Sequence, residues 1–492
     1  MKSKFLLLAI TFLFFSFSFI STAQNNTTNS LRKQEINKYI KAEMKIQKIP
    51  GLAYAVVLND KIIDSGVYGL ANVELNVPVN PRSLFNIGSI GKTFTATAIM
   101  LLEKDGKLSI NDPINKYLDS LPDTWNNITI KHLLSHTSGI KDHWHDFPGY
   151  SFLKIDRKQE ITEAQFIRIA TSAPLNFTPG ERWAYSNANF TLLGFIIHKV
   201  SGKPLSEFVK ERITGPMGMR QTRYENFTEI IPNRATGYLL DDSNTLIHGL
   251  YFSNFYASQG EMGIITTATD MAKWSMALDD GKILGKETLQ QMWTPSKLNN
   301  GLEAVGLVGA NYGLGWGIFD HRGHKEISHA GSFGNGYTAQ FVRFPEKNLA
   351  VIVLANLNPT NVSWISYNIA GFYIPELKGI DQLKFEVNAD TNLNKKVYAL
   401  LDDLGNDNLD TSLITVSFKQ RINPITKLLF NGQGAKPLLS FVHSDRIENN
   451  TLLRYGAPVE KINYYKTTVE NETHYLAIYF SANNKIADMR GY

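Results

Sequence analysis

Ser89 and Lys92 stand three residues apart where a helical pattern begins. This spacing places both side chains on one face of a helix, within reach of each other. Serine is a weak nucleophile until a base removes its proton, and lysine acts as that base only when burial lowers its pKa toward neutrality. Alone the pair is a weak signal, because serine is also a common residue at a helix start. The apolar residues that follow recur at helical steps and predict burial of one helix face: Ile90, Phe94, Ala98, Leu101 and Leu102.

Tyr185 and Asn187 form a second candidate group, in a polar segment before an apolar helical pattern. A phenol relays a proton when a neighbouring ammonium depresses its pKa, and a side-chain amide holds a substrate carbonyl. Loop-like segments let such groups project into a cleft. By itself, Tyr-x-Asn is equally typical of a tyrosine in an ordinary turn.

The third candidate segment runs from His329 through Gly331 and Ser332 to Gly336. A strand that ends in glycine-rich backbone lets a substrate chain approach closely, because no side chain blocks it. Its backbone N–H groups, together with that of Ser89, would form an oxyanion hole. The alternative is a loop that simply requires glycine.

Ser-x-x-Lys, then Tyr-x-Asn, then His-x-Gly on a late strand resemble the motifs of the serine β-lactamase and penicillin-binding protein superfamily. Within it, the chain is similar to the class C β-lactamase and D-alanyl-D-alanine carboxypeptidase branch. The resemblance covers residues 32–372. Three flanking segments agree with it: 130–140 (IKHLLSHTSGI), 260–271 (GEMGIITTATDM) and 312–317 (YGLGWG).

This resemblance implies a role for each motif residue. The catalytic residues are Ser89 as acylated nucleophile, Lys92 as general base and Tyr185 as proton shuttle to the leaving group. The substrate-binding residues are Asn187, which holds a carbonyl or acyl side chain, His329, Gly331 and Ser332, whose N–H completes the oxyanion hole. Two departures matter: His329 stands where many relatives have lysine, and Glu261 follows Gly260 where Gly-Gly is usual.

We therefore expect an exported serine hydrolase that forms an acyl-enzyme on an amide, peptide or ester, of the D-Ala-D-Ala carboxypeptidase, D-aminopeptidase or esterase type. The alternative is a catalytically inactive penicillin-binding-like sensor of cell-wall peptides. Expected partners are small-molecule or peptide substrates, with peptidoglycan fragments as candidates, and we expect no cofactor and no metal. The substrate and the oligomeric state stay open.

The expected fold class is α+β: an antiparallel sheet of five or more strands, flanked by helices and interrupted by a helical insertion. A helix at 31–47 precedes a hairpin of residues 51–57 and 62–70, joined by Asn59-Asp60. The sheet is completed by four later strands, expected at 313–319, 324–329, 337–344 and 349–355.

Three regions divide the chain. Residues 1–23 are typical of a secretory signal, with a basic start and an apolar run, whether cleaved or kept as an anchor. We expect the hydrolase domain at 24–384 and a small α+β domain at 385–492. That domain should contain a helix at 392–404 and strands at 459–466 and 474–481, followed by 485–489. The hydrolase part is expected to fold without it. From the secretory signal we expect a periplasmic or secreted location. Once the signal is cleaved, we expect no stable membrane-spanning segment.

Composition excludes several classes of function. The chain has 492 residues and no cysteine, so thiol catalysis, cysteine metal sites and disulfides are ruled out. A formal net charge of +5 is too small to indicate nucleic-acid binding. His143 and His145, between Asp142 and Asp146, are weak metal-ligand candidates, because no third ligand follows at helical spacing.

Overall fold

The computed structural model describes most of the chain after residue 28. The described residues are 29–144, 153, 156–257, 259–305, 311–386, 390–406, 409–419, 440–447, 452–454, 457–469 and 472–491. The expected signal at residues 1–23 lies outside them, as do His145 and Asp146. In the described part, no helix is both long and apolar enough to cross a bilayer.

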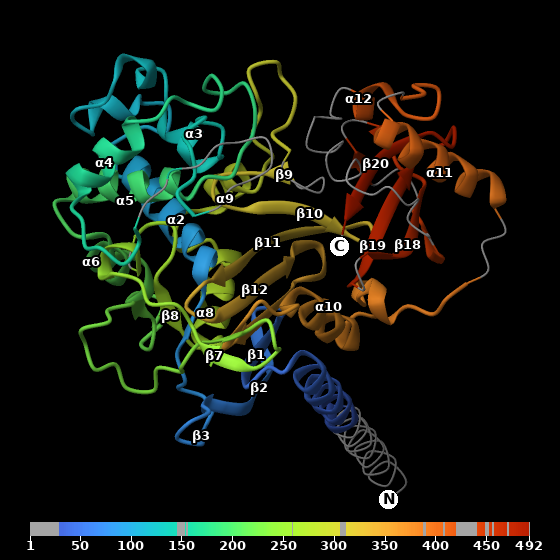
Figure 1. Cartoon of the computed structure of the whole chain (residues 1–492), viewed down its shortest axis with the longest axis horizontal. Helices are drawn as coiled ribbons and strands as arrows, with labels where there is room; N and C mark the ends of the chain where they lie inside the picture. The colour runs from blue at the N-terminus through green and yellow to red at the C-terminus, as the bar shows by residue number, and fades with distance from the viewer. Residues whose placement is uncertain are drawn as a thin grey trace, which may run out of the picture.

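An antiparallel sheet, eight-stranded over the described residues, forms the centre of the structure (Figure 1). Its strands are β1 Gly51–Leu58, β2 Lys61–Asn72, β3 Val77–Pro78, β9 Asn311–Tyr312, β10 Gly317–His321, β11 His324–Phe333, β12 Tyr337–Phe344 and β13 Leu349–Ala355. They follow the order β3-β2-β1-β13-β12-β11-β10-β9. Because β1 pairs with β13, the first and last strands lie side by side and the sheet is closed by the two ends of the domain, which confirms the expected class.

The first hairpin turns where the sequence predicts. Asn59 and Asp60 join β1 to β2 with φ angles of 50° and 57°. Left-handed conformations at both positions match the twist of the flanking strands, and asparagine and aspartate tolerate them better than most residues. The hairpin therefore keeps β1 in register with β2, and β1 in turn pairs with β13.

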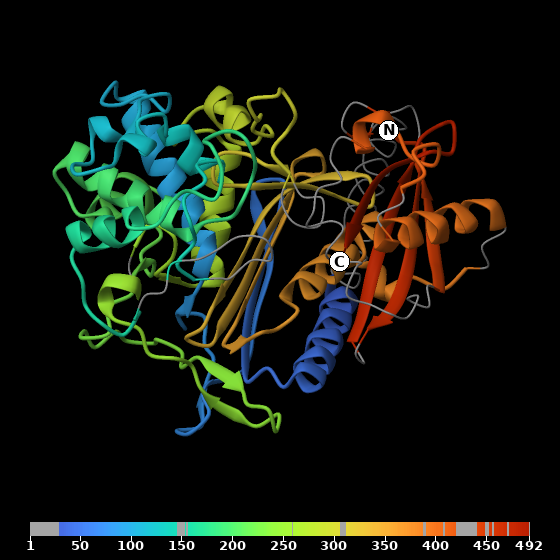
Figure 2. The ribbon, with the colours of Figure 1, turned by 45° about the horizontal axis from the view of Figure 1, so that its top comes forward.

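Side chains along β1 alternate between two cores, as the pleat of a strand requires. Ala53 and Ala55 face the larger core, which contains the helix α2 Gly91–Lys104. Tyr54 and Val56 face a second core, formed with the helix at residues 29–47 and with α10 Val362–Tyr373. Helices thus cover both faces of the sheet (Figure 2).

The helical insertion packs on one face of the sheet. Its helices are α3 Ile130–Leu134, α4 Glu163–Thr171, α5 Asn187–Ser201, α6 Leu205–Val209, α7 Asn254–Ala257, α8 Ala268–Asp279 and α9 Lys286–Met292. Short strands accompany them: β4 Phe85–Asn86, β5 Arg223–Tyr224 and β8 Ile264–Thr266 in one small sheet, and β6 Tyr238–Leu240, β7 Leu246–His248 and β14 Leu357–Asn358 in another.

Helix α2 is buried on every face from Gly91 to Leu102, rather than on the one face that periodicity indicates. Phe94 stacks on Trp274 of α8 with ring centroids 4.4 Å apart. Elsewhere on α2, a Cβ on Gly315 would lie only 2.5 Å from the Ala96 methyl group. The insertion therefore surrounds α2 and removes its first turn from water.

The strand expected at 313–319 begins only at Gly317, because residues 313–316 form a turn between β9 and β10. β9 ends at Tyr312 and β10 begins at Gly317, which pairs back with Tyr312. Gly315 has a φ of +78° in this turn. The close approach of Gly315 to α2 accounts for the turn, and the local sequence pattern does not reveal that contact.

The C-terminal region forms its own sheet. In chain order its elements are α11 Thr391–Asn406, α12 Val416–Lys419, β15 Ser440–Arg446, β16 Leu453–Arg454, β17 Ala457–Pro458, β18 Lys461–Val469, β19 Glu472–Phe480 and β20 Ile486–Gly491. The expected helix and the last three strands are confirmed, whereas β15 was not predicted, because its polar sequence lacks a buried alternation. The division of the chain at residue 384 stays a prediction.

A buried polar contact links this region to the main sheet. Tyr479 donates to Asp320 Oδ1 at 3.0 Å, and Arg490 donates to the Asp320 carbonyl. The Arg490 guanidinium also lies 4.0 Å from Glu326, whose carboxylate is buried and accepts from Tyr367 at 3.0 Å. Removal of the C-terminal region would therefore take the Arg490 guanidinium away from the Glu326 carboxylate.

Arg490→Met should lower the free energy of unfolding by about 3 kcal/mol or more, since it leaves a buried carboxylate unpaired. Burial raises the pKa of Glu326, and Arg490 opposes this rise. In the variant the folded state then binds a proton at higher pH than the unfolded chain, so the loss should shrink as pH falls toward about 4.3. Urea unfolding at several pH values measures this. The matched change Arg223→Met, at an exposed pair with Glu229, should cost less than about 1 kcal/mol. A loss equal to this control would contradict the assignment.

Candidate active site

Ser89 lies in a tight turn between β4 and α2, formed by Gly88–Ile90. Gly88 has a φ of +50°, and a Cβ there would lie 3.0 Å from the backbone nitrogen of Ser332. Lys92 follows in the first turn of α2 and its Nζ lies 3.0 Å from Ser89 Oγ. The structure therefore brings the two motif residues into hydrogen-bond contact.

The Lys92 side chain is fully buried and has three hydrogen-bond partners. Besides Ser89, its Nζ donates to Asn187 Oδ1 at 2.7 Å and to the Glu261 carbonyl at 2.9 Å. Burial lowers the pKa of Lys92 to about 7, against the opposing influence of Glu261 and Asp142. A large fraction of this amine is therefore neutral at physiological pH.

The geometry also decides where the lone pair of a neutral Lys92 points. Carbonyl oxygens only accept hydrogen bonds, so the two N–H groups of the neutral amine are directed at Asn187 and at Glu261. The third tetrahedral position of the nitrogen then carries the lone pair and faces Ser89 Oγ. A neutral Lys92 is thus oriented to accept the Ser89 proton.

Tyr185 lies beside this pair, with a hydrogen bond to Ser89 and its ring centroid 5.0 Å from Lys92 Nζ. The sequence-based expectation was a phenol whose pKa an ammonium depresses. In the structure burial raises the pKa of Tyr185, and the carboxylates of Asp142 and Glu261 raise it further. The hydroxyl therefore stays protonated and can both accept and donate a proton along a hydrogen-bonded chain.

Asn187 begins α5 and is buried, and its amide is already occupied. Its Nδ2 donates to Asp142 at 3.1 Å and its Oδ1 accepts from Lys92. Its expected contact with a substrate carbonyl or acyl side chain stays a prediction. In this arrangement Asn187 holds the base in place.

His329 on β11 is also buried, with 8% of its surface exposed. Its Nδ1 lies 2.6 Å from the Ala330 carbonyl and must be the protonated nitrogen, so Nε2 accepts from the Tyr312 hydroxyl at 3.0 Å. Burial, and secondly Lys92, lower the pKa of His329 to about 3. His329 is therefore a neutral imidazole bonded to Tyr312, and its expected contact with substrate stays a prediction.

The neutral state of His329 predicts a flat response to pH. The ratio of kcat/KM for a carboxylated peptide to kcat/KM for a neutral ester should stay constant between about pH 5 and 8, because the imidazole carries no charge in this range. Parallel pH profiles of the two substrates test this. A ratio that falls as pH rises through about 6.5 would show that His329 titrates and attracts the carboxylate.

Gly331 and Ser332 on β11 pass directly against the turn that carries Ser89. A Cβ on Gly331 would lie 1.8 Å from the Ile87 carbonyl and 3.2 Å from the Ser89 nitrogen, so only glycine fits. The Ser332 backbone nitrogen would lie 3.0 Å from a Cβ on Gly88. The backbone nitrogens of Ser89 and Ser332 therefore both lie where β11 packs against this turn, and the oxyanion hole that they would form stays a prediction. The Ser332 hydroxyl itself donates to Asn358 at 2.6 Å.

An aromatic cluster that the motifs do not predict surrounds Tyr185. The His136 ring lies 4.3 Å from Tyr185 and 4.9 Å from Tyr312, measured between centroids. Trp183 lies 6.3 Å from Tyr185 and 6.1 Å from Tyr312. The segment containing Tyr312 and the loop containing His136 were each noted in the sequence, but no local pattern shows that they meet. Together they form an apolar, aromatic flank to the proposed site.

The candidate metal ligands do not form a metal site within the described part of the chain. Among the described residues no group of three or more histidine, aspartate or glutamate side chains could hold a metal ion. His143 Nε2 lies 3.5 Å from Glu261 Oε1, and both side chains are buried. Asp142 is engaged with Asn187.

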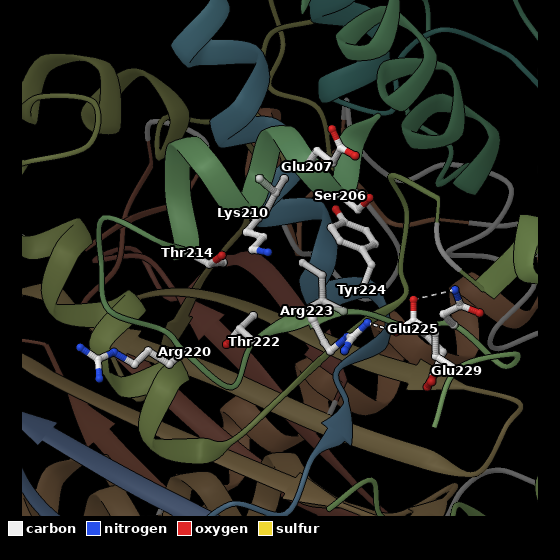
Figure 3. A pocket seen from close by; sticks show the side chains of 13 residues that line it. Ser206, Glu207, Lys210, Thr214, Arg220, Thr222, Arg223, Tyr224, Glu225 and Glu229 are labelled. Carbon is white, nitrogen blue, oxygen red and sulfur yellow. Dashed lines mark hydrogen bonds and ion pairs between the residues drawn. The ribbon is translucent and has the colours of Figure 1, made fainter. Parts of the chain in front are cut away.

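A separate cavity of about 440 Å³ lies between the helical turn Lys210–Thr214 and β5 (Figure 3). Side chains of both charges line it, including Lys210, Arg223 and Glu229. Arg223 is paired with Glu229. Ser89 is not among its lining residues, so this cavity is distinct from the candidate active site.

Comparison with known proteins agrees with this geometry. The family described as Beta-lactamase matches residues 36–372. Penicillin-binding protein 4* of Bacillus subtilis (strain 168) is 30% identical over 303 residues, which are 59% of this chain and 64% of that protein. The putative penicillin-binding protein PbpX of the same organism is 33% identical over 264 residues, which are 54% of this chain and 62% of that protein. The chain thus spans less than two thirds of the length of these curated relatives.

Solved structures show the same fold. A penicillin-binding protein homologue from Pyrococcus abyssi, described as octameric, matches with a TM-score of 0.60 at 23% identity, covering 92% of this chain and 94% of that one. A class C beta-lactamase matches with a TM-score of 0.58 at 22% identity, covering 70% and 96%. The chain therefore belongs to the beta-lactamase family, within the superfamily of serine β-lactamases and penicillin-binding proteins. The resemblance to this superfamily that was inferred from the three motifs is confirmed.

Proposed function

We propose that this protein is an exported serine hydrolase that forms an acyl-enzyme at Ser89. One observation carries the proposal. Lys92 is a buried amine with a pKa of about 7, and two carbonyl acceptors leave its lone pair directed at Ser89 Oγ. A base of this pKa removes a proton efficiently near neutral pH.

The proposed reaction begins when Lys92 takes the Ser89 proton as Oγ attacks the substrate carbonyl carbon. The N–H groups of Ser89 and Ser332 receive the negative charge that develops on the carbonyl oxygen. Tyr185 then passes its proton to the leaving nitrogen or oxygen and is reprotonated by Lys92, as the bond to the leaving group breaks. Water attacks the acyl-enzyme in the second half. The proton of this water passes to Lys92, and Lys92 gives a proton to Ser89 Oγ as the bond between Oγ and the acyl carbon breaks.

The proposed substrate class is an ester or amide that does not need a carboxylate anchor at His329. The neutral state of this imidazole and its bond to Tyr312 support that choice. The aromatic flank of Trp183 and Tyr312 favours an apolar or aromatic substituent. Peptidoglycan-derived peptides of the D-Ala-D-Ala type remain the competing candidates. These peptides are included because the two Bacillus relatives are named as penicillin-binding proteins.

Export to the periplasm or to the exterior is part of the proposal. It rests on the basic and apolar composition of residues 1–23. Expression of the full chain, followed by N-terminal sequencing of the exported form, tests it. A mature N-terminus near Gln24 is expected, whereas an intact Met1 on cytoplasmic protein would contradict it.

Turnover distinguishes the enzyme from a sensor that is merely acylated. A panel of aryl esters, D-amino-acid amides, D-Ala-D-Ala peptides and a chromogenic cephalosporin should give repeated turnover on neutral esters or amides. If every substrate releases only one equivalent of product per protein, the protein is acylated without turnover, and this result would favour the sensor. No product and no covalent adduct from folded protein would overturn the proposal.

A further inference from the structure

Two buried carboxylates lie close enough to Lys92 to influence its pKa. Asp142 follows α3 and is 4% exposed, and Glu261 precedes β8 and is fully buried. The proposed reaction uses neither side chain, although burial of a carboxylate is costly unless it is paired or hydrogen-bonded. The hydrogen-bond partners of Asp142 and Glu261 indicate the role of each carboxylate.

Asp142 fixes the orientation of the Asn187 amide. Its Oδ1 accepts from the Asn187 backbone N–H at 2.7 Å and from Nδ2 at 3.1 Å, and its Oδ2 lies 3.3 Å from Nδ2. A carboxylate can only accept, so Nδ2 must face Asp142 and Oδ1 must face Lys92. Asp142 thereby ensures that Lys92 meets an acceptor and not a donor.

Glu261 acts on Lys92 from a second element. Its backbone carbonyl is the acceptor of Lys92 Nζ, and its Oε2 accepts from Thr191 at 2.9 Å. Thr191 lies one turn after Asn187 on α5, so this helix anchors the Glu261 carboxylate as well as the amide. Oε1 lies 3.5 Å from His143 Nε2. The carbonyl that orients Lys92 is thus anchored through the side chain of its own residue.

We propose that Asp142 and Glu261 are positioning residues of the Lys92–Ser89 pair: Asp142 orients the amide that Lys92 donates to, and Glu261 anchors a carbonyl and places a negative charge near the amine. The inference rests on the proposed acyl-enzyme function. Lys92 is held directly by groups from α5 and from the segment before β8, and the loop after α3 holds the first of these in place. Its lone pair is directed at Ser89 only while all three stay in place.

Electrostatics support the same assignment. Burial lowers the pKa of Lys92, and Glu261 first, then Asp142, raise it again. Loss of either negative charge should therefore lower this pKa further, and the acidic limb of the activity profile should move to lower pH. The titratable groups that influence the pKa of Lys92 or are influenced by it are Asp142, Glu261, His136 and His329. The Tyr185 ring also faces Lys92, with its centroid 5.0 Å from Nζ. Both histidines are neutral, because burial lowers their pKa values.

The test compares Glu261→Gln and Asp142→Asn with wild type in two measurements. The first is the rate of Ser89 labelling by a fluorophosphonate as a function of pH. The second is the titration of Lys92 itself in protein carrying ¹³C-lysine, with its resonance assigned by its loss in Lys92→Met.

Glu261→Gln should lower the midpoint of both curves by about one pH unit. Asp142→Asn should lower it less, and should also reduce the plateau labelling rate about tenfold or more, because Asn187 is then free to turn its amide.

Two controls separate this role from general stability. Glu261→Asp keeps the charge and should keep the midpoint within a few tenths of a unit. Glu225→Gln removes another buried carboxylate, one that pairs with Arg234, and should leave the midpoint unchanged even where it lowers stability. Midpoints of Glu261→Gln equal to wild type in both measurements would overturn the inference. Absence of labelling in wild type would overturn the proposed function, while the lysine titration would still test the positioning of Lys92.

Discussion

Ser89→Ala should abolish both substrate turnover and covalent labelling, because it removes the hydroxyl that lies 3.0 Å from Lys92 Nζ. The free energy of unfolding should change by less than about 1 kcal/mol, since alanine suits the start of a helix and the hydroxyl is not part of the core. Ester hydrolysis, fluorophosphonate labelling and urea unfolding measure the three quantities on one preparation. Because the substitution removes only one oxygen, loss of activity in a folded protein assigns the chemistry to Ser89.

Ser206→Ala is the matched control for this result. Ser206 lies on α6 beside the cavity of Figure 3, and its removal should leave turnover and labelling at wild-type levels. Covalent adduct formation by folded Ser89→Ala at the wild-type rate would contradict the assignment. Such a result would place the nucleophile elsewhere in the chain.

Lys92→Met and Tyr185→Phe should each lower the acylation rate by about 100-fold or more, because each removes one step of the same proton path. The double variant should lose much less than the product of the two single losses, as groups that act as a unit do. In wild type, the rate should rise with pH up to about 7, where Lys92 becomes neutral, and fall about tenfold for each pH unit below it.

The pH profiles separate the roles of these two residues. Tyr185→Phe should keep the acidic limb, because Lys92 still titrates, whereas Lys92→Met should lose it. Pre-steady-state labelling across this pH range measures both effects. Fully multiplicative losses in the double variant would mean that Lys92 and Tyr185 act independently, and a rate unaffected by pH between about 5 and 8 would rule out Lys92 as the titrating base.

Much of the central sheet was predictable because its signals are local. The bounds of β12 and β13 follow from apolar runs with turn residues between them, and Asn59-Asp60 specify the first hairpin. The turn at residues 313–316, where a strand was expected, was not predictable. It depends on contact between Gly315 and α2, which are far apart in the sequence. The polar strand β15 was missed for a related reason, since its place in the sheet comes from pairing with β18 rather than from its own pattern.

The sequence predicts which residues form the site, but it is less informative about their protonation and their hydrogen-bond partners. The spacing of Ser89 and Lys92 predicts their contact correctly. That His329 is neutral and that the Tyr185 pKa is raised depend on burial by segments from elsewhere in the chain. The role of Asp142 depends on its contact with Asn187, 45 residues away. Motif order identifies which residues belong together, and tertiary packing decides their charge and hydrogen-bond partners.

The most direct measurement of the central claim is the location of the covalent adduct by mass spectrometry. Protein labelled with a fluorophosphonate or a penicillin is digested with trypsin, which cuts after Arg82 and Lys92 and releases the peptide of residues 83–92. This peptide contains Ser83 and Ser89, and fragment ions distinguish them. We expect one adduct per chain, on Ser89, formed more slowly below about pH 7 as Lys92 becomes protonated. An adduct on Ser83 or on any other residue, with Ser89 unmodified, would contradict the account.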